Sequence, residues 1–172
     1  MKQDKISFIK NISIFNGLSD QQLRKVADIC KEIIFDTGKT IMREGDTGDT
    51  MYIFIEGEVS FSNTATLKIP KKGFDKAETI GGKLNAKFVP FFGDMALFED
   101  APRSATISAI TQCILYEIKR SDFENICASD MEMGYKILKN IIPVISGRVR
   151  KTTSDIVKLT TLLTIVLSKK NS

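Results

Sequence analysis

Histidine is absent from the 172-residue sequence, and cysteine occurs three times. Without an imidazole, the chain cannot supply a histidine general base, a His-ligated haem or a zinc site that uses His. Cys30, Cys113 and Cys127 are odd in number and form no C-x-x-C pair, which excludes a four-cysteine cluster and a complete disulfide framework within one chain. We expect buried thiols in a reducing cytoplasm.

Long hydrophobic runs are also missing. Charges interrupt the N-terminal MKQDKISFIK, so we expect no export signal, and the apolar LTTLLTIVL is about half the roughly 20 residues of a membrane helix. We expect no membrane association. The net charge of +4 is too small to indicate nucleic acid by itself, and it suits a phosphate-bearing small ligand equally well.

The first two thirds of the chain predict one helix followed by many short strands. Residues 19–33 have helical periodicity, with Ser19 or Asp20 as N-cap. Residues 33–62 and 104–123 alternate short apolar runs with turns, which is typical of an antiparallel sandwich or barrel. Residues 51–62 are the clearest pair of strands, and residues 66–84 predict a polar hairpin with turns near Gly73 and at Gly81-Gly82.

The last third is helical in pattern. A helix is expected to begin at a Ser121 or Asp122 cap, and from about residue 131 the pattern stays helical, with a kink or restart at Pro143. An a/d stripe then favours a parallel two-stranded coil. The alternative is that this stripe packs on the β region of its own chain. The stripe consists of Ile145, Val149, Thr152, Ile156, Leu159, Leu163 and Val166.

The segment FFGDMALFEDAPRSA, residues 91–105, has the composition of an anion site. Gly93 lets the backbone approach a ligand, the next residues can form a short helical turn, and Arg103 returns beside Ser104. The alternative is a surface loop in which Arg103 pairs with Glu99 or Asp100. No nucleophile with an activating base and no metal-ligand cluster is found, so we expect neither an enzyme nor a metal site.

This segment resembles the phosphate-binding cassette of cyclic-nucleotide-binding domains, and REGDTGDTMYIFIEGEV resembles their strand-turn-strand signature. The resemblance covers about residues 12–128. It implies an α+β fold, a jelly-roll-like antiparallel β-roll flanked by N-terminal helices and a long C-terminal dimerisation helix. The expected domains are a cyclic-nucleotide-binding domain with an N-terminal helical segment at 1–128 and a helical region at 129–172, heptad-patterned from about 144.

The resemblance also implies roles for particular residues. Gly93 and Asp94 would contact the ribose, and the backbone at Met95 and Ala96 would cradle the cyclic phosphate. Arg103 and Ser104 would bind the phosphate oxygens. The family usually has glutamate where this chain has Asp94, and losing a hydrogen bond to a charged group costs about 1.5 to 3 kcal/mol.

RVRKTTSDIVKL, residues 148–159, resembles the dimer helix of catabolite-activator-like members. In those members a threonine and the next hydroxyl residue touch the adenine from the two subunits, which implies this role for Thr152 and Thr153. The alternative is that Thr152 is merely tolerated in the stripe. We expect Arg148, Arg150 and Lys151 to form a solvated flank of the coil rather than to touch an acidic partner.

These observations predict a cytoplasmic, non-catalytic receptor without a cofactor. Its ligand would be a cyclic purine mononucleotide, cAMP in preference to cGMP, and it would transmit binding through a homodimer helix to an unidentified protein effector. Only LSKKNS follows Val166, which leaves no room for the family's winged helix, so no direct DNA binding is expected. The alternatives are a degenerate structural dimer module and the sensor piece of a longer transcription regulator.

Overall fold

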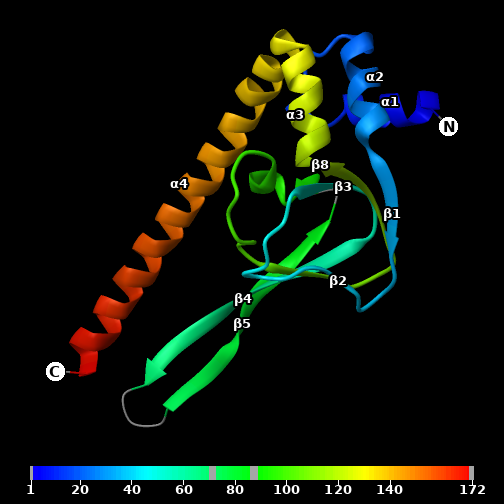
Figure 1. Ribbon diagram of the computed structural model, residues 1–172. Coiled ribbons are helices and arrows are strands. Elements are labelled where there is room, and N and C mark those ends of the chain that lie inside the picture. The colour runs from blue at the N-terminus through cyan, green and yellow to red at the C-terminus, as the bar shows by residue number, and fades with distance from the viewer. Residues whose placement is uncertain (1, 70–72, 86–88, 171–172) are drawn as a thin grey trace.

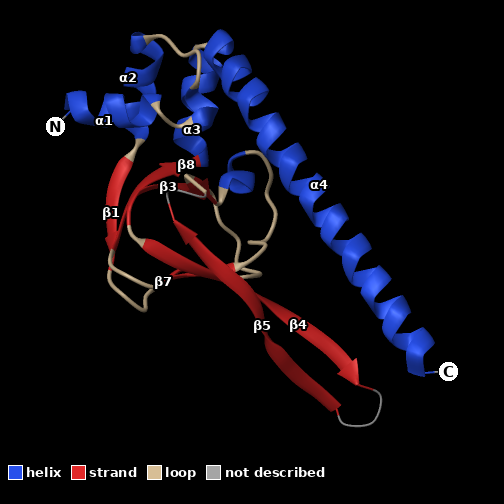
Figure 2. Cartoon of the chain, turned by 180° about the vertical axis from the view of Figure 1, so that it is seen from behind, coloured by secondary structure: helices blue, strands red, loops and turns tan. Residues whose placement is uncertain are grey.

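Most of the helices gather at one end of a pair of β-sheets (Figures 1 and 2). The computed structural model describes residues 2–69, 73–85 and 89–170. Figures 1 and 2 show the N-terminal helices and α3 together above the strands, while α4 runs past them and away. The helical elements are α1 (Lys2–Lys10), the 3-10 turn η1 (Ser13–Phe15), α2 (Asp20–Ile29), the 3-10 turn η2 (Asp94–Leu97), α3 (Arg120–Ser129) and α4 (Met131–Lys170).

The strands form two four-stranded antiparallel sheets, in the orders β1-β8-β3-β6 and β2-β7-β4-β5. This arrangement confirms the predicted α+β fold with an antiparallel β-roll. The strands are β1 (Lys31–Phe35), β2 (Thr40–Met42), β3 (Thr50–Glu56), β4 (Glu58–Ile69), β5 (Gly73–Asn85), β6 (Phe91–Phe92), β7 (Thr106–Ala109) and β8 (Cys113–Lys119).

The strand pair predicted at residues 51–62 is two strands in different sheets. β3 pairs with β8 and β6, whereas β4 pairs with β5 and β7. Gly57, at the crossing point, has a φ of 107°, and a Cβ there would lie 2.7 Å from Cys113 Sγ. Glycine therefore lets the chain change sheets without a hairpin.

The hairpin predicted at residues 66–84 lies within the longer antiparallel pair β4–β5, which projects from the sheets in Figure 1. The turn predicted near Gly73 falls at residues 70–72, outside the described residues. The turn predicted at Gly81-Gly82 is wrong, because both glycines lie within β5 opposite Ser62 and Phe61. A Cβ at Gly81 would approach Phe61 O to 2.0 Å, so close strand contact explains that glycine.

Two helix boundaries also differ from the prediction. Ser19 is the N-cap of α2, in a capping box with Gln22, but the helix ends at Ile29 rather than at residue 33 because the β-branched run pairs with β8. The cap predicted for α3 at Ser121 or Asp122 is wrong. The helix begins one residue after β8, at Arg120, whose backbone N–H donates to Asp49 O at 2.7 Å.

α4 continues from Met131 to Lys170 without a restart at Pro143. Two side chains attach its first turns to the rest of the fold. Asp130 accepts the Met133 N–H at 3.0 Å and pairs with Lys25 of α2, also at 3.0 Å. Asn140 donates to the carbonyls of Ile14 and Asn16 at 3.1 and 2.8 Å. The N-terminal half of α4 is therefore anchored on α2 and η1.

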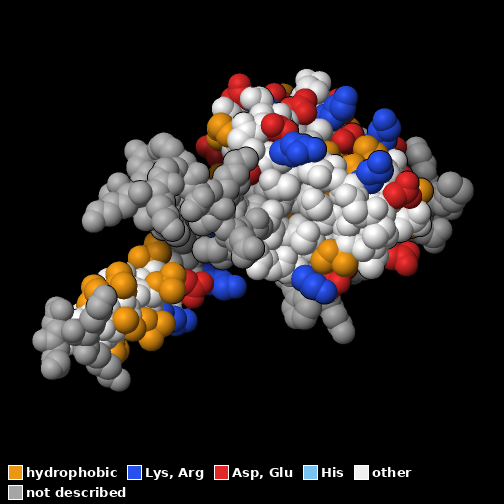
Figure 3. All heavy atoms as spheres, turned by 90° about the horizontal axis from the view of Figure 1, so that it is seen from below, with side chains coloured by type: hydrophobic (Ala, Val, Ile, Leu, Met, Phe, Trp, Pro, Cys, Tyr) orange, Lys and Arg blue, Asp and Glu red, His pale blue; other side chains and the backbone are white. Residues whose placement is uncertain are grey.

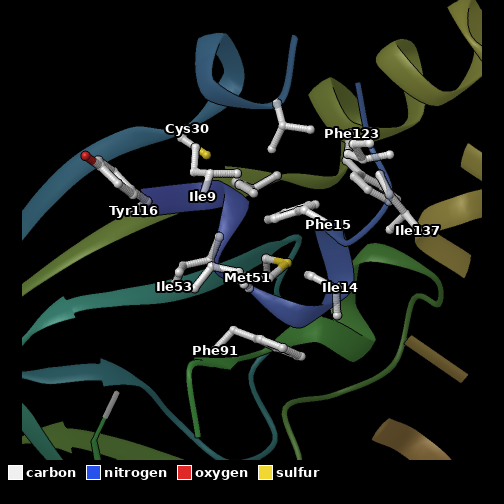
Figure 4. Packing of buried hydrophobic residues seen from close by; sticks show 14 of the residues in the cluster. Ile9, Ile14, Phe15, Cys30, Met51, Ile53, Phe91, Tyr116, Phe123 and Ile137 are labelled. Carbon is white, nitrogen blue, oxygen red and sulfur yellow. The ribbon is translucent and has the colours of Figure 1, made fainter. Parts of the chain in front are cut away.

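The core has two parts. Figure 4 shows the larger one, where α1, η1, α2, α3 and α4 cover one face of the first sheet through residues such as Phe15, Met51 and Ile137. The smaller one lies between the sheets and includes Phe54 and Leu115. The two residues of β6 belong one to each core, Phe91 to the larger and Phe92 to the smaller. The segment that follows Phe92 therefore starts from a fixed point.

The heptad stripe on α4 is largely exposed to solvent. Its apolar members from Ile145 to Val166 are between 37% and 66% exposed. The alternative, in which the stripe packs on the β region of its own chain, is therefore wrong. The same spacing continues back to Met131 through Ile142, Leu138 and Tyr135, which are all exposed. Hydrophobic side chains cover the projecting end of the helix in Figure 3. Among the described residues, no helix is both long and apolar enough to cross a membrane.

Candidate functional site

A cavity of about 570 Å³ lies between α4 and the segment that follows β6. This volume is typical of small-molecule sites. Apolar residues from β2, β4, β5 and β7 form part of its wall. The polar side chains that line it are Asp94, Glu99, Arg103, Ser104, Arg148, Lys151, Thr152 and Asp155.

Gly93 connects β6 to η2 in a left-handed conformation, with a φ of 73°. A Cβ there would lie 3.0 Å from Thr50 O and 2.9 Å from Arg103 Nη1, so both conformation and space require glycine. The turn closes through an Ala96 N–H to Gly93 O bond of 3.2 Å. Ala96 is buried, and Met95 is half exposed beside the cavity.

Arg103 lies at the wall of the cavity with its side chain turned onto β3. Its guanidinium donates from Nη1 to Thr50 O at 2.7 Å and from Nη2 to Thr50 Oγ1 at 2.8 Å, and Nη1 also lies 3.5 Å from Gly93 O. The residue is 8% exposed. It passes so close to Gly48 that a Cβ there would lie 2.2 Å from Arg103 Nε. Gly48 and Thr50 therefore hold the arginine in place.

The alternative in which Arg103 pairs with Glu99 or Asp100 is not found in the described part of the chain. Asp100 instead lies 3.5 Å from Arg120, and Arg103 contacts neutral oxygen atoms. Burial lowers the pKa of the Arg103 guanidinium, while the nearby Asp49 acts in the opposite direction. A buried cation without a carboxylate in contact is well placed to bind an anion from the cavity.

Asp94, the first residue of η2, is 2% exposed and binds Arg148 of α4. Arg148 Nη1 lies 2.8 and 2.9 Å from the two carboxylate oxygens, and its guanidinium carbon is 5.7 Å from the centre of the Phe91 ring. The prediction that Arg148 belongs to a solvated flank is therefore wrong. A buried carboxylate needs a charged partner, and α4 supplies it across the cavity.

The remaining predicted residues divide into two groups. Ser104 and Thr152 both line the cavity, and the backbone carbonyl of Ser104 accepts a bond of 2.7 Å from Asn63 Nδ2. Thr153 lies outside this lining, and its hydroxyl donates to Val149 O at 3.0 Å within the helix. The structure thus brings every predicted site residue except Thr153 to one cavity.

The sequence reasoning missed Arg148, Lys151 and Asp155 as cavity residues. Arg148 precedes Thr152 by four positions and Asp155 follows it by three, so helical periodicity places them on one face. The assignment of Thr152 to the site therefore also predicts Arg148 and Asp155 as cavity residues.

Comparison with known proteins now supplies the family. Residues 32–130 match the family described as the cyclic nucleotide-binding domain, which is more than half of the chain. The chain belongs to this family. The matched region of the cyclic nucleotide-binding domain contains η2 and Arg103 but ends before α4, so Arg148 and Thr152 reach the cavity from outside it.

Three proteins illustrate the similarity. The cAMP-dependent protein kinase regulatory subunit of Dictyostelium discoideum is 30% identical over 122 residues, which are 70% of this chain and 35% of that protein. The regulatory domain of Toxoplasma gondii PKA, solved with cAMP, is 28% identical with a TM-score of 0.54, covering 73% of this chain and 44% of that one. A cyclic nucleotide-binding domain from Methylobacillus flagellatus has a TM-score of 0.69 at 21% identity, covering 91% and 82% of the two chains.

The chain spans between 16% and 35% of the length of the first curated relatives that it matches. The similarity therefore concerns one part of those proteins and not their whole length.

Proposed function

We propose that this chain is a cytoplasmic, non-catalytic receptor that binds a cyclic purine mononucleotide, with cAMP preferred over cGMP. The observation that carries the proposal is the convergence of η2, Arg103 and α4 on one cavity of about 570 Å³. A cyclic nucleotide needs an anion site, a hydrogen-bonding site for a ribose and a surface for a base. The cavity has a candidate for each.

The phosphate would lie at the Arg103 end. A guanidinium carries five N–H donors, and the bonds to Thr50 and Gly93 do not use all of them, so Arg103 can keep its position while it binds a phosphate oxygen. The Ser104 hydroxyl and the Met95 backbone N–H would provide further donors, and the backbone at Ala96, whose N–H closes the turn to Gly93 O, would form the floor of the cradle. An arginine held in advance loses less conformational entropy on binding, which favours affinity.

The ribose would lie against Gly93 and Asp94, and the base would meet α4. The Thr152 hydroxyl can accept a hydrogen bond from the 6-amino group of adenine, and it can also donate to the 6-oxo group of guanine, so the preference for cAMP is drawn from the relatives. The Dictyostelium relative is described as cAMP-dependent, and the Toxoplasma domain was solved with cAMP. Lys151 and Asp155 also line the cavity, and their charged groups could contact the polar edge of either purine. A binding experiment should therefore compare cAMP with cGMP.

The Asp94–Arg148 pair supports a route from ligand to helix. A ribose hydroxyl that donates to Asp94 would share this carboxylate with Arg148, and Arg148 is part of α4. Ligand binding would therefore change the position that α4 prefers. To move a receptor from 1:99 to 99:1, the ligand must favour one state by about 5.5 kcal/mol.

We further propose that α4 forms a homodimer through its exposed heptad stripe and passes the change to a protein effector. Thr152 belongs both to this stripe and to the cavity lining. In a parallel pair, the base site would therefore lie beside the partner helix, within the region where the partner's Thr153 could contact the base. The domain division at about residues 128–129 belongs to the same proposal.

Isothermal titration calorimetry with cAMP and cGMP tests the proposal. We expect wild-type protein to bind both, cAMP more tightly, and Arg103→Met to lose about a hundredfold or more in affinity, since two charge-assisted bonds to phosphate are removed. Arg150→Met, which removes the same charge from an exposed position of α4, is the matched control. Wild-type protein that gives no heat with either nucleotide at high micromolar concentration would instead indicate a degenerate, structural module.

A further inference from the structure

The side chain of Arg120 donates hydrogen bonds to the backbone of the segment that follows β6, away from its own helix. Although it is the first residue of α3, its Nε donates to Ala96 O and its Nη2 donates to Glu99 O at 2.7 Å. Nη2 also lies 3.4 Å from Gly48 O in the loop before β3. The side chain is 19% exposed and, among the described residues, does not belong to the cavity lining.

The carboxylate near Arg120 does not explain this arrangement. Asp100 Oδ1 lies 3.5 Å from Nη1, and its side chain is 79% exposed, so this pair contributes little. The guanidinium is instead directed at backbone carbonyls of residues 96 and 99, at the C-terminal end of η2. A cation at this end of a helical turn satisfies carbonyls that the turn itself leaves unpaired.

Arg120 and Arg103 hold adjacent residues where the loop before β3 enters the strand. Arg103 binds Thr50 through its side chain, and Arg120 binds Gly48 O through its side chain and Asp49 O through its backbone N–H. Because Arg120 also binds Ala96 and Glu99, it fixes η2 relative to the loop on which Arg103 rests. The distance between the two halves of the proposed phosphate site therefore depends on Arg120.

We infer that Arg120 is a positioning residue for the cyclic phosphate: it holds the η2 backbone and the Arg103 guanidinium at the separation that lets each engage a different exocyclic phosphate oxygen. This inference rests on the proposed function. Arg120 acts through other groups and does not itself touch the ligand. Since it also begins α3, which packs on α4, any shift of that helix pair would reach the phosphate site through the same side chain.

The two exocyclic oxygens of a cyclic phosphate are not equivalent, and replacing either one by sulfur gives two diastereomers. The test therefore measures the affinity of cAMP and of its Rp and Sp phosphorothioates for wild-type protein, Arg120→Met and Arg120→Lys, with thermal melting of each protein. Lys119→Met is the matched control, because it removes one positive charge from the neighbouring, exposed position.

We expect Arg120→Met to weaken cAMP binding about tenfold and to move the affinity ratio of the two isomers toward one. A residue that only stabilised the fold would lower the melting temperature and leave this ratio unchanged. Arg120→Lys keeps the charge but replaces the planar fork by one ammonium group, so we expect a ratio between those of wild type and Arg120→Met. Lys119→Met should bind all three ligands as wild type does.

The inference is overturned if wild-type protein binds cAMP but Arg120→Met keeps the wild-type isomer ratio, or if wild-type protein does not distinguish the isomers. Should Arg120→Met fail to fold, Arg120→Lys decides: a wild-type ratio overturns the inference and a reduced ratio supports it. If wild-type protein binds no cyclic nucleotide at all, the proposed function fails first, and the inference falls with it.

Discussion

Removing the guanidinium of Arg148 should leave Asp94 as a buried charge without its partner. The change Arg148→Met keeps most of the length of the aliphatic stem but deletes the guanidinium, and with it both bonds of 2.8 and 2.9 Å to the carboxylate and the contact 5.7 Å from the centre of the Phe91 ring. Asp94 is 2% exposed, so water cannot easily replace the lost donors. The variant should therefore be less stable than wild type.

The size of the effect follows from the exposure of the two side chains. Breaking a fully buried ion pair costs about 3–5 kcal/mol. The Arg148 side chain is 43% exposed, so solvent already weakens this pair, and we expect a loss of about 1–3 kcal/mol. For a domain of this size, about 2 kcal/mol lowers the melting temperature by roughly 4–8 °C. Circular dichroism melts of the nucleotide-free protein measure this shift.

A double-mutant cycle with Asp94→Asn separates the pair from other effects. Once Asp94 is neutral, the second change Arg148→Met should cost much less than it does alone. Arg150→Met, an exposed neighbour on α4, should melt within about 1 °C of wild type because surface substitutions are usually near neutral. The reasoning is refuted if Arg148→Met melts like Arg150→Met, or if the two losses in the cycle simply add.

Three further changes test other parts of the structure. Leu159→Glu should convert a dimer into a monomer in light scattering without lowering the stability of the monomer, while Ser154→Glu, outside the stripe, should leave the dimer intact. Thr152→Val should reduce cAMP affinity about fivefold, the value of one neutral hydrogen bond, and calorimetry that finds no loss would remove the hydroxyl from base recognition. Asp130→Asn should lower the melting temperature at pH 7. The difference in melting temperature between wild type and this variant should shrink as the pH falls below 4, because the Met133 N–H and then Lys25 lower the Asp130 pKa from its ordinary value of 3.8. The folded state thus gains stability above this ordinary value and loses it as the pH falls through the lowered pKa; a difference that stays constant with pH would contradict this.

The β-roll could be predicted because its signals are local. Alternating apolar residues and glycines specify short strands, and the cap at Ser19 specifies the start of α2. Sheet membership could not be predicted in the same way. The run from Met51 to Ser62 reads as a pair of strands but does not say that they belong to different sheets, because the Cys113 side chain against Gly57 comes from the other end of the β region. The prediction of a turn at Gly81 failed for a similar reason. A glycine is needed there because the Phe61 carbonyl on the neighbouring strand leaves no space for a Cβ atom.

In the candidate site, too, residues close together in the chain could be predicted and contacts between distant residues could not. The residues from Gly93 to Ser104 form one contiguous stretch, so the sequence alone could group them. Arg148 was assigned to a solvated flank because its neighbours are charged and its partner Asp94 is far away in the chain. For Arg103, the sequence suggested an anion site, but the inward contacts with Thr50 and Gly48 depend on a loop that no short motif connects to it.

The contact between Gly48 and Arg103 has a consequence for how this protein can change. A methyl group at Gly48 would occupy the space of the guanidinium, but the space is vacated once Arg103 is replaced by a short side chain. The harm done by Gly48→Ala should therefore largely disappear in an Arg103→Ala background. A descendant that abandons its anion site becomes free to vary at Gly48, whereas one that has already filled Gly48 cannot easily regain the arginine. The order of substitutions would then make loss of the ligand hard to reverse.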